Sequence, residues 1–350
     1  MTSMEHPTET TPAREVESSR ERLAGIAGGG WIFVLLIALI AIFSILRPTQ
    51  FGSAYNLSQL TINAAILLVL SLGQTYVIVA KGIDLSVGSV LVFSSVISAQ
   101  VMLMLSGAPG STFGTTDANW VIVLIGTLVA IGSGALWGAL NGVLTAVARI
   151  PALIVTLGTL GMALGFAQIL TGGVDVRAMP QLLVDAVGSG SIFGVPTLVA
   201  MAVIVTALAA IVLHLTRFGV RTYAVGSNME AARRAGVNVK AQLIAIYTIS
   251  GGLAGIAAVM ANARFSTTTI SGHAMDNLST ISAVVLGGTS LFGGIGTVAG
   301  TLVGVFIPII LLNGFVILGI PPFWQTVAMG AVLIIAVWID QIKRRAREGG

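Results

Sequence analysis

Long apolar stretches dominate the chain, and the polar residues lie mainly in short segments between them. A helix that crosses a membrane needs about 20 mostly apolar residues. Stretches close to that length recur along the chain, which predicts spans at residues 30–46, 57–80, 86–105, 120–141, 152–171, 197–215, 241–261, 278–293, 297–317 and 323–339. The eighth of these is the weakest, because it is short, rich in Ser and Thr, and closed by two Gly residues.

The overall composition supports the same interpretation. Of 350 residues, 55% are hydrophobic and only 9% are charged, whereas an ordinary globular domain has about 25% charged residues. The 43 Gly residues suit helices that pack closely in lipid. We therefore predict an all-α polytopic membrane protein with about ten transmembrane helices.

The distribution of basic residues predicts the orientation. If the N-terminus is cytoplasmic, only Arg47, Arg177 and Arg264 of the 17 Lys and Arg residues fall on the outer side. Cytoplasmic segments of membrane proteins carry the excess of Lys and Arg, so we expect both termini to be cytoplasmic. The predicted parts are a disordered tail at 1–29, a transmembrane domain at 30–342 and a basic tail at 343–350.

One charged, Gly-containing segment, residues 217–240, separates the sixth and seventh spans. Asn228 is suited to cap a short helix at 229–235, with Glu230 in its first turn and Gly236 just beyond its end. Two interpretations are open. The segment is a solvated loop that merely follows the charge bias, or it carries a helix on which a soluble cytoplasmic partner docks. We favour the docking helix.

Asp84 is the charge that most needs an explanation, since it lies between two apolar spans in the segment Lys81–Ser89. One hypothesis is that it gates a pathway or binds a coupling proton. The other, which we favour, is that it caps the helix of the third span by accepting backbone N–H groups.

Uncharged polar residues inside the spans are further candidates for a pathway. Each of them alone is better explained as a hydrogen bond to a neighbouring helix. Together they indicate an uncharged interior that tolerates a neutral, hydroxyl-rich solute better than an ionic one. The candidates are Gln74, Asn141, Thr156, Thr159, Gln168, Asn262 and Asn313.

A weak internal repeat adds a structural expectation. The motif Gly-x-x-Leu-x-x-Gly occurs at 82–88 and again at 288–294. Leu-Asn-Gly followed by Ile-Pro occurs at 140–151 and again at 312–321. A duplicated architecture would place interrupted helices at corresponding positions in the two halves, where transporter pathways are commonly built.

Several function classes are excluded by missing residues. The chain has no Cys, so disulfide, thiolate and Cys-based metal chemistry are impossible. The three His residues lie far apart and without paired carboxylates, so we predict no catalytic and no metal site. No G-x-x-x-x-G-K-[ST] motif occurs, so any nucleotide hydrolysis must come from a separate chain. A net charge of +4 gives no reason to expect a nucleic-acid partner.

Four motifs, in this order, resemble the bacterial ABC sugar-importer permeases of the ribose/xylose/galactose type. They are GIDLSVGS (82–89), IPALIVTLGTLG (150–161), TYAVGSNMEAARRAGVNV (222–239) and AVVLGGTSLFGGIGTVAGTLVG (283–304). The resemblance covers roughly residues 30–342. One departure stands out: Asn277-Leu278-Ser279, with Asp276 before it, occupies the place of a Glu-Leu-Asp triplet that is frequent in that family.

The resemblance implies a permease in the bacterial cytoplasmic (inner) membrane that is not itself an enzyme and holds no cofactor. It further implies a cytoplasmic ATP-binding subunit that uses the ATP, a periplasmic or tethered sugar-binding protein, and a second permease copy, either identical or a close paralogue. The segment received by the ATP-binding subunit would include Asn228, Glu230, Ala231, Ala232, Arg233 and Gly236.

The predicted function is therefore ATP-driven import of a monosaccharide that a separate protein delivers. The alternatives are an ABC permease for an autoinducer-like furanone or a branched-chain amino acid, and a secondary transporter. The absence of intramembrane carboxylates for ion coupling and the predicted docking helix argue against the secondary transporter.

Overall fold

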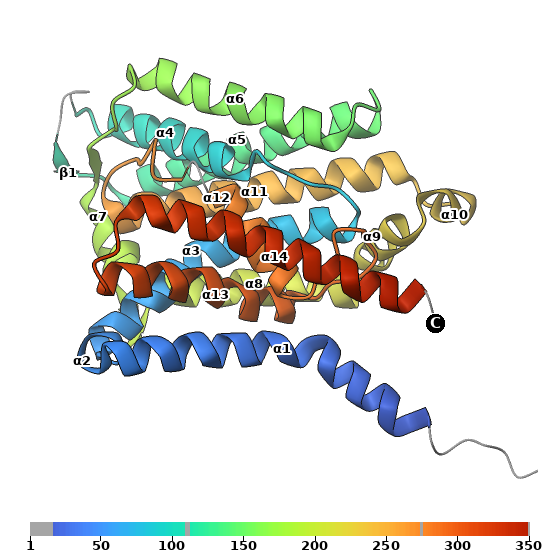
Figure 1. Cartoon of the computed structure of the whole chain (residues 1–350). Coiled ribbons are helices and arrows are strands. Elements are labelled where there is room, and N and C mark those ends of the chain that lie inside the picture. Colours follow the sequence, from blue (N-terminus) through green and yellow to red (C-terminus); the bar gives the residue numbers. More distant parts are fainter. Residues whose placement is uncertain (1–16, 109–112, 274–275, 349–350) are drawn as a thin grey trace, which may run out of the picture.

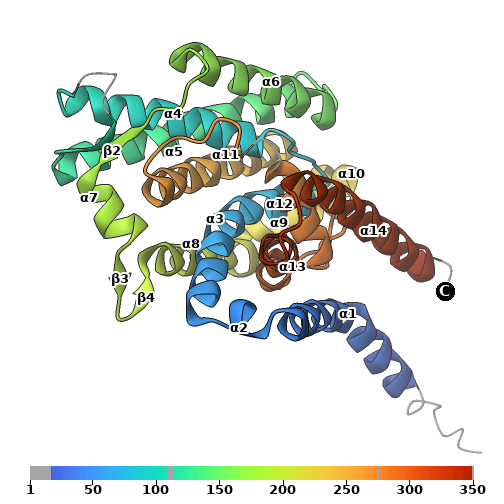
Figure 2. The ribbon, with the colours of Figure 1, turned by 60° about the vertical axis from the view of Figure 1, so that its left-hand side comes forward.

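The structure is a computed structural model that describes residues 17–108, 113–273 and 276–348, and most of these residues are helical. The long helices lie side by side in a bundle (Figures 1 and 2). The helices are α1 (Glu17–Leu46), α2 (Pro48–Phe51), α3 (Ala54–Val79), α4 (Val87–Leu105), α5 (Trp120–Ala146), α6 (Ala152–Thr171), α7 (Gln181–Leu183), the π-helix η1 (Val184–Gly188), α8 (Thr197–Leu215), α9 (Arg217–Ser227), α10 (Met229–Arg234), α11 (Val239–Phe265), α12 (Asp276–Leu286), α13 (Val298–Ile317) and α14 (Pro322–Glu348).

Two small sheets accompany the bundle. β1 (Gly114–Thr116) pairs in parallel with β2 (Ala178–Pro180), and β3 (Ser191–Ile192) forms an antiparallel hairpin with β4 (Val195–Pro196). β1 lies at one end of the bundle and α10 at the other (Figure 1). The longest connections thus occupy opposite ends.

Seven of the described helices are long and apolar enough to cross a membrane: α3, α4, α5, α6, α8, α11 and α13. Shorter apolar stretches lie within α1 (Ile32–Leu46) and α14 (Phe323–Trp338). These positions agree with all the predicted spans except the one at 278–293. The prediction of a helical, multi-pass membrane protein is confirmed, while the total of ten spans stays a prediction.

Helix α3 occupies the centre of the bundle. Its most apolar window is 94% buried, against 22% for the peripheral α8. Polar contacts fix α3 on two sides. The Tyr76 hydroxyl donates to the Ala209 carbonyl on α8 (2.6 Å), and the Thr75 hydroxyl lies 2.7 Å from the Thr301 hydroxyl on α13. α11 and α12 also pack against it. The residues that follow α3 are therefore anchored in the core.

Helices α5 and α11 touch backbone to backbone. Gly134, Gly138 and Gly142 recur every fourth residue on α5, and so face the same side. A Cβ on Gly134 would overlap the Gly251 carbonyl, one on Gly138 the Tyr247 carbonyl, and one on Gly142 would lie 2.6 Å from the Ile244 Cα. Small residues that let helices approach closely are typical of packing in membranes.

The eighth predicted span is corrected by the structure. α12 has 11 residues and is about 16 Å long at 1.5 Å per residue, roughly half the thickness of the hydrocarbon layer. The helix does not reach 293, because the chain turns at Gly287 and Gly288, and Gly288 has a φ of +89°. Residues 278–293 thus form a short helix and a turn.

The chain before α12, at residues 266–273, is not helical and packs along α4. Ile270 packs against Val92 and Val96 of α4. The Asp175 carboxylate accepts the Ile270 backbone N–H (2.8 Å) and the Thr268 hydroxyl (3.1 Å). Irregular backbone at membrane depth is tolerated where protein surrounds it and its polar groups are paired. The Ser- and Thr-rich sequence at 266–271 favours such side-chain bonds over a helix.

We expect Gly138→Ala to destabilise the protein by about 1–3 kcal/mol, the usual cost of overpacking a core, because the new Cβ would force α5 away from the Tyr247 carbonyl. Gly132→Ala on the same helix is the matched control. No atom lies within 4 Å of its Cβ position, so the higher helix propensity of Ala should leave stability unchanged or raised. The midpoint of thermal unfolding in detergent measures both; equal midpoints for the two variants would contradict the close contact.

Candidate functional site

Residues 217–240 form two helices, α9 and α10. α10 confirms the predicted short helix. Residues 217–227, for which the sequence analysis predicts no helix, form α9, whose first turn is capped by the Thr216 hydroxyl. Gly219 and Gly226 look like loop residues in the sequence. Their role is to bring α9 against the core, since Cβ atoms there would overlap the carbonyls of Leu213 and Val79.

Helix α10 has the predicted caps. The Asn228 side chain accepts the Ala231 N–H at 2.9 Å, and Gly236 has a φ of +84° just past the end. Glu230 in the first turn forms ion pairs with Arg233 (3.3 Å) and Arg234 (3.6 Å). These pairs are exposed, so they contribute little to stability.

One face of α10 is left open. Ala232 is buried, whereas Met229, Glu230, Ala231 and Arg233 are exposed. The helix lies at the extreme end of the bundle (Figure 1). A short helix that is anchored by one alanine and presents charged and apolar groups together is suited to contact another protein.

Helix α9 is hydrogen-bonded to two parts of the core, the chain around Gly296 and helix α11. The Tyr223 hydroxyl donates to the Gly296 carbonyl at 2.7 Å, and burial raises the pKa of Tyr223, so the phenol keeps its proton. The Gln242 side chain of α11 donates to the Phe218 carbonyl (3.0 Å) and the Thr222 hydroxyl (2.8 Å). α9 therefore cannot shift without moving the segments it touches.

The two Gly-rich motifs of the predicted repeat lie next to each other. The Gly294 N–H donates to the Val79 carbonyl at 2.8 Å, and a Cβ on Gly293 would lie 2.7 Å from the Lys81 Cβ. The end of α9 joins them, since Gly226 packs on Val79 and Gly294. We call residues 79–86 and 287–297 the junction. The duplication itself stays a prediction.

Asp84 lies in the junction at the start of a buried hydrogen-bond network. Its Oδ1 accepts the backbone N–H (2.9 Å) and the hydroxyl (2.6 Å) of Ser86. The Asn141 amide on α5 donates to the same hydroxyl oxygen (2.9 Å), and the Thr159 hydroxyl on α6 donates to Asn141 Oδ1 (2.7 Å). This network ties the junction to α5 and α6.

Two further contacts complete the surroundings of Asp84. The Ser250 hydroxyl of α11 lies 3.5 Å from Oδ2, and the Thr156 hydroxyl of α6 lies 3.4 Å from the Ile83 carbonyl. Burial raises the pKa of the Asp84 carboxyl, and the hydrogen bonds from Ser86 and Ser250 oppose that rise. Asp84 thus does accept a backbone N–H, but the N-cap of α4 is Ser86, two residues closer to the helix, so Asp84 is not the capping residue that the sequence predicts.

The remaining candidates are scattered through the bundle. Asn262 on α11 pairs with Ser95 on α4 (2.6 and 3.0 Å), and Asn313 on α13 donates to Asn56 on α3 (2.8 Å). Gln74 is fully buried, and its amide has no hydrogen-bond partner among the described residues. Gln168 is exposed on α6. Four of the eight candidates, Asp84, Asn141, Thr156 and Thr159, therefore come together and the other four do not.

Sequence reasoning missed the hydroxyls that complete these contacts, Ser86, Ser95 and Ser250. In the sequence, only their positions inside apolar spans or beside Asp84 distinguish these Ser residues. Because Ser is frequent in membrane helices, such a position alone does not identify a functional residue. Among the described residues, no group of three His, Asp or Glu side chains is arranged to hold a metal ion.

Comparison with known proteins gives a consistent result. The family model described as "Branched-chain amino acid transport system / permease component" matches residues 56–337. The ribose import permease protein of Escherichia coli (strain K12) is 36% identical over 317 residues, which are 89% of this chain and 93% of that protein. No solved structure matches the chain.

Two further relatives have similar coverage. The fructose import permease protein of Rhizobium meliloti is 33% identical over 90% of this chain and 85% of its own length. The galactose/methyl galactoside import permease protein of Escherichia coli (strain K12) is 32% identical over 90% of this chain and 94% of its own.

Two substitutions of Asp84 separate its possible roles. Asp84→Asn keeps an oxygen for Ser86 and gains an amide that can donate to Ser250, so we expect normal insertion and normal uptake. Asp84→Leu leaves the Ser86 N–H buried and unpaired, at a cost of about 1–3 kcal/mol, and should lower the amount of folded protein. Yield from the membrane fraction and uptake in cells measure the two effects. If Asp84→Asn folds normally but transports nothing, the carboxylate itself is needed, as in the gating hypothesis.

Proposed function

This chain belongs to the family of ABC importer permeases that includes these sugar permeases, and we propose that it carries a monosaccharide, delivered by a separate binding protein, across the bacterial cytoplasmic membrane. The match over residues 56–337 covers most of the chain, and the coverage of the relatives is equally broad. Such a permease is not an enzyme, so ATP hydrolysis belongs to a cytoplasmic ATP-binding partner.

A monosaccharide is the substrate class with the best support. The relatives described above are named for ribose, fructose and galactose, although the family model is named for branched-chain amino acids. α3, α4, α5, α6, α8 and α13 contain no Asp, Glu, Lys or Arg. Spans without charged residues suit a neutral polyol better than a zwitterionic amino acid. The furanone, amino acid and secondary-transport alternatives are not favoured by these findings.

Helix α10 is the proposed contact with the ATP-binding subunit. Its caps give it a fixed shape, and its exposed face offers Met229 for apolar contact and Glu230 and Arg233 for polar contact. Asn228, Ala231 and Gly236 shape the two ends, and Ala232 anchors it. This helix at the end of the bundle is the observation that carries the proposal.

The positions of three segments support the proposed orientation. The beginning of α1, helix α10 and the end of α14 lie toward one end of the bundle (Figure 1). That arrangement supports ten crossings with both termini in the cytoplasm, where the positive-inside rule puts the basic residues of 217–240. The binding protein would then dock at the opposite end, which contains β1, β2 and the β3–β4 hairpin.

The contacts support a proposed route for motion. α10 follows α9 without a flexible linker, since Asn228 both ends α9 and caps α10. α9 is bonded to the junction through Tyr223, and the junction to α5 and α6 through Asp84, Ser86 and Asn141. In this proposal ATP binding moves α10, and packed segments with paired polar groups carry the displacement to the spans.

The polar candidates have different proposed roles. Asp84, Asn141, Thr156 and Thr159 position α6 and the junction, because they are buried and bonded to one another. Gln168 remains the candidate for direct contact with the sugar, since it is exposed on α6, and a second permease copy facing α6 would enclose the path. Gln74, Asn262 and Asn313 stay pathway candidates of lower rank because they lie inside the protomer.

The proposal is tested with Glu230→Lys in vesicles that contain the complete transporter. The reversed charge faces the positive end of α10 and repels Arg233 and Arg234. The dipole effect is only about 0.3–1 kcal/mol, so the protein should still insert and assemble. We expect sugar-stimulated ATP turnover to fall sharply, while Glu230→Gln, the control without a reversed charge, retains most of it. Normal turnover for Glu230→Lys would show that the ATP-binding subunit does not depend on α10.

A further inference from the structure

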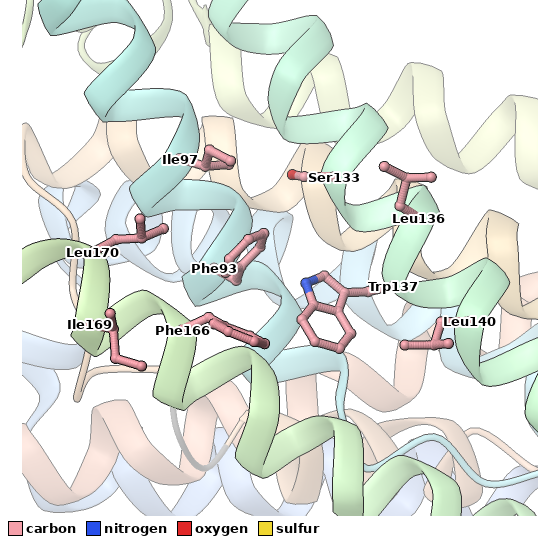
Figure 3. Close-up of a pocket in the computed structure, with 9 residues that line it drawn as sticks. All are labelled: Phe93, Ile97, Ser133, Leu136, Trp137, Leu140, Phe166, Ile169 and Leu170. Atoms are coloured by element: carbon pink, nitrogen blue, oxygen red, sulfur yellow. The ribbon is translucent and has the colours of Figure 1, made fainter.

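A crevice of about 590 Å³ between α4, α5 and α6 is unsuited to a sugar. Figure 3 shows its lining, in which the rings of Phe93, Trp137 and Phe166 lie near one another. Ser133 carries the one hydroxyl among the lining residues, and that hydroxyl already donates to the Ala130 carbonyl (3.0 Å). A sugar here would lose hydrogen bonds to water without replacement, which costs free energy. A solute site instead requires polar side chains that are exposed within the bundle.

Asn63 is such a side chain, and it lies on the central helix α3. It is exposed, whereas every residue from Ala64 to Ala80 is buried. It follows the first residue of α3, Ala54, by nine positions, or about 14 Å along the helix axis. That end of α3 adjoins α2, at the end of the bundle that contains β1 (Figure 1). An amide that faced hydrocarbon at this depth would have no hydrogen-bond partner, which is costly, so its exposure indicates contact with water.

The polar neighbours of Asn63 support contact with water. Gln59, one turn nearer the start of α3, lies on the same face and accepts a hydrogen bond from the Arg264 guanidinium of α11. Both Gln59 and Arg264 are half-buried. Charged side chains within the span of a membrane protein face the bundle interior or a water-filled space. Asn63 is therefore the innermost exposed member of a polar group that begins near the outer end of α3.

Asn63 faces the side of α3 on which α12 packs. Helices α8, α11, α12 and α13 all pack along α3. Gly73 contacts α11, Thr75 contacts α13 and Tyr76 contacts α8. Because successive residues of a helix point about 100° apart, Gln74 takes the remaining direction, toward α12. Asn63 precedes Gln74 by 11 residues, about three turns, and so shares its face.

Helix α12 is too short to cover Asn63. α3 and α12 both end at the junction, where a Cβ on Gly296 would lie 2.6 Å from Thr289 and 2.8 Å from Val79. The 11 residues of α12 extend about 16 Å back from that end. Asn63 lies 16 residues before Val79, about 24 Å along α3. The beginning of α12 thus stops about 8 Å short of Asn63.

The first residue of α12 offers a second polar group. The side chain of Asp276 is 24% exposed, and its Oδ2 lies 2.7 Å from Nδ1 of His273. The other carboxylate oxygen is left to accept a further hydrogen bond. A carboxylate accepts from hydroxyl groups, and an amide such as that of Asn63 both donates and accepts.

We propose that Asn63 and Asp276 form a binding site for the hydroxyl groups of a neutral sugar at the N-terminal end of α12, in an opening that water enters from the outer side. This inference rests on the proposed import function, because it makes the opening a stage on the path of the sugar. α12 closes the path further in, since Gln74 beneath it is fully buried. Passage beyond Asp276 then requires α12, which leads directly into the junction, to move.

Asn63→Cys tests the access of water, because it gives the chain its only thiol. The full chain in lipid nanodiscs is treated with a charged, water-soluble methanethiosulfonate. Ile204→Cys is the matched control, seven positions into the spanning helix α8 and 60% exposed. We expect Asn63→Cys to react more than about tenfold faster, because a thiol in hydrocarbon stays protonated and the thiolate is the reactive form. Asp276→Cys gives a second measurement with the same expectation. Rates no faster than that of Ile204→Cys would overturn the proposal.

Protection by solutes tests the binding site itself. D-ribose, D-fructose and D-galactose are each added at high concentration before Asn63→Cys is labelled. We expect at least one of them to slow the reaction, whereas L-leucine should not. Adding Asp276→Asn keeps an oxygen for His273 and should weaken this protection by about tenfold, the difference between a charged and a neutral hydrogen bond. The absence of protection by all three sugars, or protection that Asp276→Asn leaves unchanged, would overturn the proposal.

The labelling does not depend on ATP, on the binding protein or on uptake. Sugar uptake by the complete transporter, measured separately in vesicles, decides the proposed function. Normal uptake without access or protection at Asn63 would refute the site alone. Access and protection at Asn63 in a transporter that imports no sugar would refute the proposed function and leave the site in place.

Discussion

The backbone contact between α5 and α11 is the constraint on which the rest of the bundle depends. In lipid, helices gain little from the hydrophobic effect when they meet, so close packing and hydrogen bonds have to hold them together. Gly134, Gly138 and Gly251 remove the side chains that would separate the two helices. The result is a closely packed pair that also carries Asn141 and Ser250, two of the groups that surround Asp84. A wider separation of α5 and α11 would pull this network apart.

The junction depends on a second kind of contact. Here the chain leaves helical geometry twice, after α3 and after α12, and both interruptions are buried against each other and against α9. Helix interruption leaves unpaired backbone groups that are costly inside a membrane. The Gly294 bond to Val79, the Tyr223 bond to Gly296 and the Asp84 bonds to Ser86 satisfy several of them. The same contacts link α10 to the spans, so the protein uses one set of bonds both for folding and, in our proposal, for coupling.

The features that sequence reasoning predicted are those with local causes. Asn228, Glu230 and Gly236 specify α10 through caps and backbone conformation within nine residues, and apolar length alone positions most spans. Helix α9 and the buried, irregular path of the chain before α12 could not be predicted from the sequence, because each depends on distant partners. Asp175 and α4 stabilise irregular backbone around Ile270, and Val79 provides the surface that Gly226 requires. Likewise the sequence marked Asp84 and Asn141 as candidates separately, but their link through Ser86 exists only in the folded chain.

The central claim is that α10 is the cytoplasmic element through which the partner moves the bundle, and chemical labelling tests it most directly. Met229→Cys places the only thiol of the chain on the exposed face of α10, and Phe193→Cys places it at the fully exposed tip of the β3–β4 hairpin. The account predicts that a membrane-impermeant maleimide labels Phe193→Cys but not Met229→Cys in cells with an opened outer envelope and an intact cytoplasmic membrane. Once that membrane is broken, Met229→Cys should be labelled, and the ATP-binding subunit should protect it. Labelling of Met229→Cys from outside the intact membrane would contradict the orientation and, with it, the proposed route of coupling.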